Sequence, residues 1–194
     1  QIDEEFLALW KDPRLCPHLH LPLQSGCKAT LRRMARNITP AEYTWLVSTA
    51  RKMIPGVALT TDIIVGFPGE GEDEFNESID FVKSTGFAGG HVFTYSARAG
   101  TAAARMPGQV PRPVRKARNA AMRGILVQAS EAYRRSFLGQ SQAVLWENAT
   151  LSSPETWENR GLSGNYLRVS ASAAQNLWNT ITPVKLTGLT EDGL

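Results

Sequence analysis

The residues of this sequence best suited to bind a ligand surround a glycine-rich turn. Residues 59–65 form a mostly apolar, β-branched run, and Gly66-Phe67-Pro68-Gly69 follows it directly. A run that is apolar on both faces is typical of a central parallel strand with helices on both sides. Ligands of α/β folds bind where such strands end, and glycines there leave room for them. An ordinary strand–helix loop has the same composition, so both interpretations stay open for this turn alone.

A second candidate lies upstream, where two histidines alternate with leucines. His18 and His20 share one face of a short predicted strand that stops at the polar residues Gln24-Ser25-Gly26. Two histidines at this spacing could ligate a metal ion, but no third ligand is close in sequence. We therefore expect polar side chains beside a bound ligand, and no metal site.

The cysteines and the overall composition narrow the class of protein. The chain has 194 residues, 42% of them hydrophobic, which is typical of a globular protein. Its two cysteines, Cys16 and Cys27, indicate a reducing compartment rather than a disulfide framework. No apolar run approaches the roughly 18 residues of a membrane span. We expect a cytoplasmic location and no membrane partner.

The elements that position these residues are predicted from periodicity and capping signals. Residues 1–10 resemble the tail of an uncapped helix, and residues 29–36 a short basic helix. Thr39-Pro40-Ala41-Glu42 is a capping box that starts a longer helix. An acidic helix follows the glycine turn and ends near residue 85, and residues 91–96 are the next strand. The alternation predicts a parallel sheet, with too few strands to close a barrel.

The last third of the chain changes in character. A long helix is predicted over residues 114–138, and β-rich runs occupy residues 143–146, 166–169 and 181–186. We predict two domains, residues 1–138 and a small antiparallel barrel at 139–194. Trp157, Arg160, Tyr166 and Arg168 combine aromatic and basic side chains, as base stacking and phosphate contact require. The two aromatic residues among them could equally belong to the core.

Charge is unevenly distributed along the chain. Residues 81–130 contain eight Lys and Arg residues and no Asp or Glu, although the net charge is only +3. A local positive field attracts phosphate backbones. A solvated helix face would show the same composition, so the two interpretations remain open.

Five motifs in order resemble the radical S-adenosylmethionine (SAM) methylthiotransferase family. They are His18-Leu-His-Leu-Pro-Leu-Gln-Ser-Gly26, Leu31-Arg-Arg-Met-Ala-Arg36, Thr61-Asp-Ile-Ile-Val-Gly-Phe-Pro-Gly-Glu70, His91-Val-Phe-Thr-Tyr-Ser-Ala-Arg-Ala-Gly-Thr101 and Gly161-Leu-Ser-Gly-Asn-Tyr-Leu-Arg-Val169. The last resembles the TRAM domain, an RNA-binding β-barrel. Residues 91–110 most resemble the branch that acts on N6-threonylcarbamoyladenosine near the tRNA anticodon. Sister branches act on N6-isopentenyladenosine in tRNA and on an aspartate of a ribosomal protein.

The resemblance implies an α/β fold, the carboxyl-terminal half of a partial TIM-like radical SAM barrel, followed by TRAM. It implies a transferase that uses SAM and two 4Fe-4S clusters to add methylthio at C2 of the adenine. Cysteine thiolates hold such clusters, but Cys16 and Cys27 match no cluster spacing. We therefore expect an upstream half of the same polypeptide to carry the cluster ligands, tRNA to be the partner, and this chain alone to be inactive. A non-catalytic RNA-binding module is the alternative.

The resemblance also suggests site residues, although it places no catalytic residue or metal ligand in this chain. Gln24 and Ser25 suit the ribose or methionyl group, Arg36 the carboxylate, and Tyr95 a stacking or hydrogen-bonding role. The complete set expected at SAM is Gln24, Ser25, Arg36, Asp62, Ile64, Val65, Gly66 and Tyr95. The set expected at RNA is Arg98, Arg105, Arg115, Lys116, Arg118, Arg160, Tyr166 and Arg168.

Overall fold

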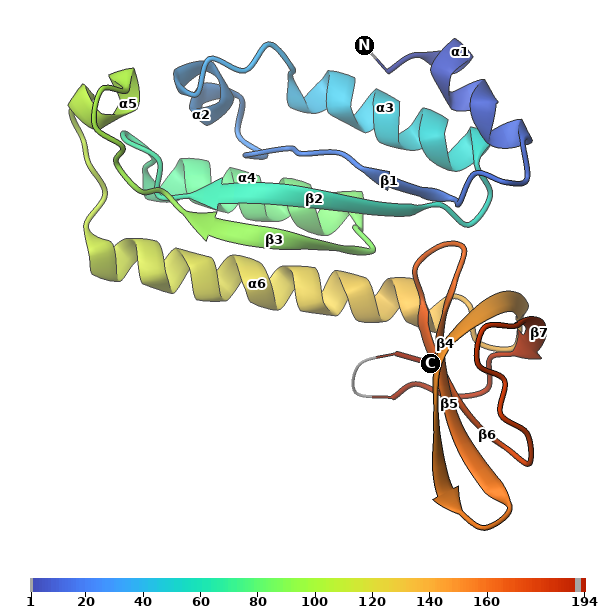
Figure 1. The fold of residues 1–194 in the computed structure, drawn as a ribbon. Coiled ribbons are helices and arrows are strands. Elements are labelled where there is room, and N and C mark those ends of the chain that lie inside the picture. The colour runs from blue at the N-terminus through green and yellow to red at the C-terminus, as the bar shows by residue number, and fades with distance from the viewer. Residues whose placement is uncertain (1, 191–192) are drawn as a thin grey trace.

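The computed structural model describes residues 2–190 and 193–194. A parallel sheet with its helices comes first, and an antiparallel sheet follows a long helix (Figure 1). The helices are α1 (Glu4–Leu7), the 3₁₀ turn η1 (Ala8–Lys11), α2 (Lys28–Arg33), α3 (Pro40–Met53), α4 (Glu72–Thr85), α5 (Ala102–Arg105) and α6 (Arg112–Arg135). The strands are β1 (His18–His20), β2 (Ala58–Val65), β3 (Gly89–Thr94), β4 (Ser141–Ser153), β5 (Thr156–Ser163), β6 (Arg168–Ala173) and β7 (Ile181–Lys185).

The first sheet has the order β1-β2-β3, and all its strands are parallel, as the sequence predicted. His20 is in register with Thr60, and Asp62 with His91. The pairing of β1 resumes beyond its end, where Gln24 forms a parallel bridge with Ile63. All three strands therefore end on the same side, where the glycine turn begins.

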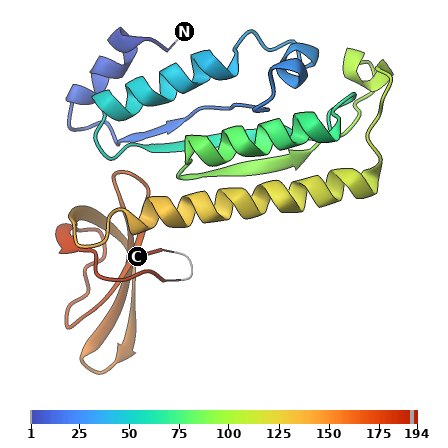
Figure 2. The same cartoon turned by 180° about the vertical axis from the view of Figure 1, so that it is seen from behind.

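Helices cover only one face of this sheet, so the expectation of helices on both sides was wrong for the described residues. In Figure 1 the near face of β2 and β3 is bare, and Figure 2, from behind, shows α4 in front of the strands. Residues Thr61, Ile63 and Val65 point to the helices and are buried, whereas Thr60 and Asp62 are only half-buried. The alternation in β2 is that of a sheet with one covered face.

Capping explains where the main helices begin and end. The predicted capping box is confirmed, because Thr39 accepts a hydrogen bond from the backbone of Glu42 and the Glu42 carboxylate accepts one from the Thr39 backbone. The first helix was predicted to lack a cap, but Asp3 Oδ1 accepts a bond of 2.9 Å from the N–H of Phe6. The basic helix α2 is shorter than predicted, because Ala35 takes a left-handed φ of 55° just beyond it.

The second sheet is antiparallel, with the order β6-β5-β4-β7. Trp146 is completely buried in its core, and Pro183 lies on the edge strand β7, where a missing N–H costs least. A closed barrel is not found among the described residues. However, Leu194 exchanges two backbone hydrogen bonds of 2.9 Å with Arg168 and Ser170, so the chain end returns to the edge strand β6.

The strand boundaries of this sheet differ from the sequence prediction. Residues 156–163 form β5, which the sequence analysis did not predict, and β4 is far longer than residues 143–146. Tyr166 lies in a turn before β6 with a φ of 63°, so the expected strand at residues 166–169 starts two residues later. Cross-strand pairing rather than local composition sets these boundaries.

The antiparallel sheet lies at the amino ends of the parallel strands, far from the glycine turn (Figure 1). The hydroxyl of Tyr133, at the end of α6, donates a 2.8 Å hydrogen bond to the carbonyl of Gly56. The side-chain amide of Asn165 donates to the same carbonyl at 3.2 Å and to the Tyr133 hydroxyl at 3.1 Å. The His18 and Tyr166 rings stack 4.3 Å apart. In the part of the chain that the structure describes, no helix is long and apolar enough to span a membrane.

Candidate functional site

The loop after β1 is built into the carboxyl edge of the parallel sheet. The Gln24 N–H donates to the carbonyl of Asp62, and the Gln24 carbonyl accepts from the N–H of Ile64, both at 2.8 Å. Gln24 adopts a left-handed φ of 71°, which turns the chain away from the strand. A Cβ on Gly26 would overlap Phe81 and the backbone of Ser78, so only glycine lets α4 pack this closely. The loop is therefore held by β2 on one side and by α4 on the other.

The glycine turn after β2 is held by a buried carboxylate. Glu70 Oε1 accepts hydrogen bonds of 2.9 Å from the N–H of Gly66 and from Arg118 of α6. Glu70 and Arg118 are 6% and 7% exposed. Burial raises the pKa of Glu70, and the bonds from Gly66 and Arg118 oppose this rise. Gly66 itself has a φ of 72°, and its missing side chain leaves room for Arg115.

Tyr95 directly follows β3 beside this turn, and its hydroxyl is a buried polar atom without a partner among the described residues. The side chain is 9% exposed and packs edge-on against Phe67, with ring centroids 5.2 Å apart. A buried hydroxyl without a hydrogen bond costs free energy. A polar group of a bound ligand would satisfy it.

The bare face of the sheet carries a hydrogen-bonded polar cluster. His20 Nδ1 lies 3.0 Å from Thr60 Oγ1, and His20 Nε2 lies 3.3 Å from Asp62 Oδ2. His18 Nε2 lies 3.1 Å from the same threonine oxygen. Burial and the neighbouring His20 lower the pKa of His18, which favours its neutral ring. Parallel register brings these side chains onto one face, as the histidine spacing predicted.

Half of the residues expected at SAM lie at the carboxyl edge, and the others lie on the bare face, in the helix-covered layer or in a loop. Gln24, Ser25, Gly66 and Tyr95 lie where the three strands end, and Asp62 and Ile64 lie on the bare face. Ser25 is 1% exposed, and its hydroxyl accepts a 3.2 Å bond from the Cys27 N–H. The Val65 side chain is 1% exposed in the helix-covered layer.

Arg36 was expected on a helix, but α2 ends at Arg33 and Arg36 follows in an exposed loop. Arg33, unlike Arg36, is held in place by partners. Its guanidinium pairs with Glu74 and donates a hydrogen bond of 3.2 Å to the Pro68 carbonyl. Arg33 lowers the pKa of Glu74. The structure shows no contact of Arg36 with the carboxyl edge in the described residues.

The iron–sulfur clusters that the resemblance implies find no set of ligands in the described residues. Cys16 precedes β1 at the amino edge of the sheet, and Cys27 follows the loop at its carboxyl edge. The intervening residues run along the sheet, so the two thiols cannot ligate one cluster. Burial raises the pKa of Cys27, which disfavours its thiolate. No group of three metal-ligating side chains occurs in residues 2–190 and 193–194.

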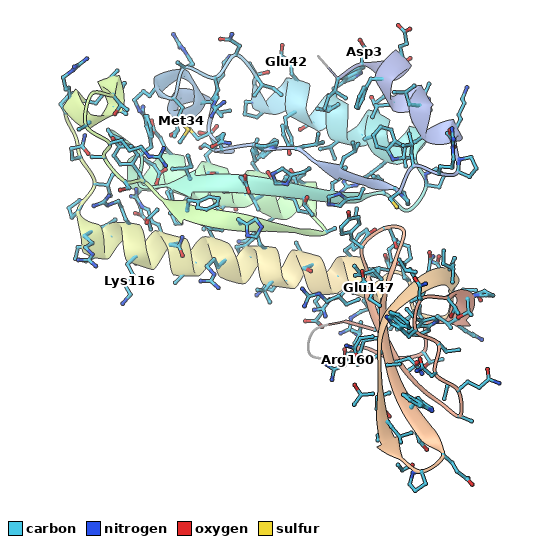
Figure 3. All side chains as sticks on the ribbon, in the orientation of Figure 1. Asp3, Met34, Glu42, Lys116, Glu147 and Arg160 are labelled. Atoms are coloured by element: carbon cyan, nitrogen blue, oxygen red, sulfur yellow. The ribbon has the colours of Figure 1, made fainter. Side chains whose placement is uncertain are left out.

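The residues expected at RNA fall into two groups at opposite ends of α6. Arg98, Arg105, Arg115 and Lys116 lie near the carboxyl edge, and Arg160, Tyr166 and Arg168 lie in the antiparallel sheet. Figure 3 shows Lys116 pointing away from α6 and Arg160 standing on the antiparallel sheet. Arg118 belongs to neither group, because its guanidinium is buried between carboxylates. Arg115 is only half-buried, but its guanidinium donates to the Tyr95 carbonyl.

Sequence reasoning missed three features of this region. The ion pairs Arg118–Glu70 and Arg33–Glu74 join residues more than 40 positions apart, and no local pattern announces them. Phe93, which is 51% exposed, is in register with Ile64 on the bare face. The available signal was an aromatic residue within the predicted strand at residues 91–96, whereas its exposure is a property of the tertiary structure.

Comparisons with known proteins agree with the motifs. A profile of the radical SAM superfamily matches residues 1–82. The fold resembles that of coproporphyrinogen III oxidase from Escherichia coli, a radical SAM enzyme, with a TM-score of 0.55 over 82% of this chain and 44% of that one. At 15% sequence identity this likeness concerns the fold alone.

Curated relatives are closer in sequence. The tRNA-2-methylthio-N(6)-dimethylallyladenosine synthase of Acidothermus cellulolyticus is 44% identical over 143 residues, 74% of this chain and 29% of that protein. The threonylcarbamoyladenosine tRNA methylthiotransferase MtaB of Bacillus subtilis is 34% identical over 184 residues, 95% of this chain and 41% of that protein. MtaB of Thermotoga maritima is 39% identical over 145 residues, 75% of this chain and 33% of that protein.

These matches span less than half the length of each relative. They combine a radical SAM profile with relatives that are all named for methylthio transfer to tRNA. The five motifs, the parallel sheet and its glycine turn lie within the matched residues. The chain therefore belongs to the radical SAM methylthiotransferase family.

Proposed function

We propose that this chain is part of a tRNA methylthiotransferase that modifies C2 of N6-threonylcarbamoyladenosine near the anticodon. In this proposal the parallel sheet is one wall of a radical SAM barrel whose other strands come from an upstream part of the same polypeptide. The antiparallel sheet is a TRAM-type RNA-binding domain, with the division near residue 138. The protein works in the cytoplasm on tRNA.

The observation that carries the choice of substrate is the resemblance of residues 91–110 to the branch that acts on N6-threonylcarbamoyladenosine. These residues include most of β3 and all of α5, which flank the carboxyl edge where the adenine would have to react. The Bacillus subtilis MtaB aligns over 95% of the chain, and its match extends into the antiparallel sheet.

A second candidate substrate is N6-isopentenyladenosine in tRNA. It is favoured by the 44% identity to the Acidothermus cellulolyticus synthase, which is higher than the identity to either MtaB protein described above. The two candidates share the reacting atom and differ only in the group on N6. They therefore require the same cofactor site and differ in the residues around the N6 substituent.

SAM fits the carboxyl edge because the buried Tyr95 hydroxyl there has no hydrogen-bond partner among the residues that the structure describes. Tyr95 would donate its hydrogen bond to the bound cofactor, and Gln24 would present its amide from a fixed turn. Ile64 and Gly66 would border the adenine, and Asp62 would remain tied to His20. When bound to a reduced cluster, SAM supplies the radical that activates the adenine C–H bond. The proposal is weaker for three members of the set. Ser25 and Val65 are buried, and Arg36 lies in an exposed loop beyond α2.

The test is the modification state of tRNA in cells that lack the coding sequence of this chain. Loss of methylthio from threonylcarbamoyladenosine, measured by mass spectrometry of tRNA nucleosides, supports the proposal. Loss only from isopentenyladenosine moves the protein to the second candidate. Unchanged levels of both would exclude a role in either modification.

A further inference from the structure

A row of hollows lies along α6, beside β3 and the antiparallel sheet, and we call this row the groove. The side chains of Arg115 and Asn119 reach from α6 to carbonyls of β3 within this row. Three hollows of about 380, 460 and 620 Å³ follow one another along it. The first contains Tyr95 and Arg112, the second Phe93 and Arg123, and the third Tyr166 and Arg168. The helix α6, along which the hollows lie, has 24 residues and is about 36 Å long.

The wall formed by α6 is a stripe of exposed basic side chains. Arg112, Lys116 and Arg123 recur at helical spacing, followed by Val127 and Ser130. Arg168 continues the positive charge at the far end. None of the residues that line the three hollows is Asp or Glu, within the part of the chain that the structure describes. The groove therefore favours a polyanion along its whole length.

Exposed aromatic side chains stand among these charges. Phe93 and Tyr166 are 51% and 59% exposed, and the second and third hollows include them. A chain of phosphates with free bases needs this combination, because bases stack on aromatic rings while cations follow the backbone. An acidic peptide would use the cations but has no need of the rings.

The free edge of β3 is not open to an added peptide strand. Asn119 donates a 2.9 Å hydrogen bond to the carbonyl of Val92, and Arg115 donates to the carbonyl of Tyr95. Side chains of α6 thus occupy carbonyls that an extended peptide would need for strand addition. Edge capping and aromatic exposure both argue against a protein occupant.

We propose that the groove between β3 and α6 binds a single-stranded segment of RNA and leads it from the antiparallel sheet to the carboxyl edge. The choice of RNA rests on the proposed function, whereas the groove is observed independently of it. The groove would hold the RNA backbone while the reacting adenosine lies beyond its end near Tyr95.

The experiment measures binding of a fluorescent twelve-nucleotide RNA and of total tRNA to the 194-residue chain over a range of salt. The groove variant is Lys116→Ala/Arg123→Ala. Its matched control is Lys52→Ala/Lys83→Ala, which removes two exposed lysines from α3 and α4, away from the groove. Each lost single-strand contact should reduce the log–log salt slope by about 0.7, so the groove variant should lose about 1.4 units and the control none.

A third variant tests stacking separately from charge. Phe93→Leu keeps an apolar side chain of similar size without the ring, and should weaken binding of the twelve-mer about fivefold or more. Circular dichroism should show that each variant is folded. Equal slopes for the groove and control variants, with Phe93→Leu unchanged, would overturn the groove while leaving RNA binding intact.

Two other outcomes separate this inference from the proposed function. If the unmodified chain binds neither the RNA nor tRNA at low salt, both the groove and the RNA role of this chain are wrong. If an Asp/Glu-rich peptide binds and loses affinity in the groove variant while RNA does not, the occupant is a protein. The groove proposal then fails, although the modification of tRNA by the whole enzyme could still be measured in cells.

Discussion

The guanidinium of Arg118 lies 2.9 Å from the Glu70 carboxylate, and this buried ion pair fastens the glycine turn to α6. Arg118 also donates to the Glu70 carbonyl at 2.8 Å, and its guanidinium lies 5.1 Å from the centre of the Phe75 ring. Glu70 in turn accepts the N–H of Gly66. The geometry of the carboxyl edge therefore depends on a residue 48 positions further along the chain.

Replacing Arg118 should destabilise the protein much more than replacing its exposed neighbour Lys116. Arg118→Ala leaves the Glu70 carboxylate buried without its counter-ion, which typically costs about 3–5 kcal/mol. Lys116→Ala should change the free energy of unfolding by less than about 0.5 kcal/mol. Urea unfolding followed by circular dichroism compares the two. Equal, small losses would show that Glu70 is stabilised without Arg118.

Tyr133 should make the contact between the two sheets sensitive to alkaline pH. Burial raises its pKa to about 12, although the bond from Asn165 opposes this. Because the folded pKa lies above the ordinary value of 10.0, the contribution to stability is complete below pH 10 and is lost as pH rises towards about 12.

The measurement is the free energy of unfolding of the wild type and Tyr133→Phe between about pH 8 and pH 12. Tyr133→Phe should be less stable at pH 8 by about 1 kcal/mol, since the bond to Gly56 is lost, and should decline less steeply above pH 10. Tyr43, whose pKa is also raised to about 12 by burial, accounts for a decline that remains. Tyr166→Phe, at an exposed position, is the control. Parallel pH curves for wild type and Tyr133→Phe would contradict the assignment.

Tyr95 should matter for the cofactor and not for the fold. Its hydroxyl is buried without a partner among the described residues, so Tyr95→Phe should leave the chain at least as stable as the wild type. Binding of SAM, measured by equilibrium dialysis with the complete polypeptide, should weaken by about 1 kcal/mol or more if the hydroxyl bonds the cofactor. Unchanged SAM binding would remove Tyr95 from the cofactor site, and a large loss of stability would assign it to the core.

Iron and sulfide should not assemble a stable cluster on this chain. Cys16 and Cys27 lie at opposite edges of the sheet, and burial raises the pKa of the second thiol. Anaerobic reconstitution should therefore yield no stoichiometric visible absorbance after desalting, and Cys16→Ser/Cys27→Ser should behave in the same way. Stoichiometric cluster absorbance that disappears in the double variant would disprove this.

Local signals in the sequence determined the parallel part of the fold. The capping box at Thr39, the β-branched run of β2 and the acidic first turn of α4 each lie within a few residues, and the structure contains each of them. The alternation of buried and half-buried residues in β2 was not predicted, because the run was expected to be covered on both faces. The antiparallel sheet was predicted only in outline. The limits of β5 and β6 depend on pairing across strands, and Tyr166 occupies a left-handed turn that its own residue type does not favour.

The sequence by itself determined the family, because five motifs occur in a fixed order and can be recognised without the fold. It also predicted a ligand site at the carboxyl edge, since glycines and polar residues follow successive parallel strands. Only the tertiary structure decided which basic side chains of α6 are exposed. Arg118 and Lys116 are two basic residues of the same predicted helix. Helical periodicity directs Arg118 toward the core, where it pairs with Glu70, and directs Lys116 toward solvent. Burial depends on what packs against each face of α6, and those partners come from distant parts of the chain.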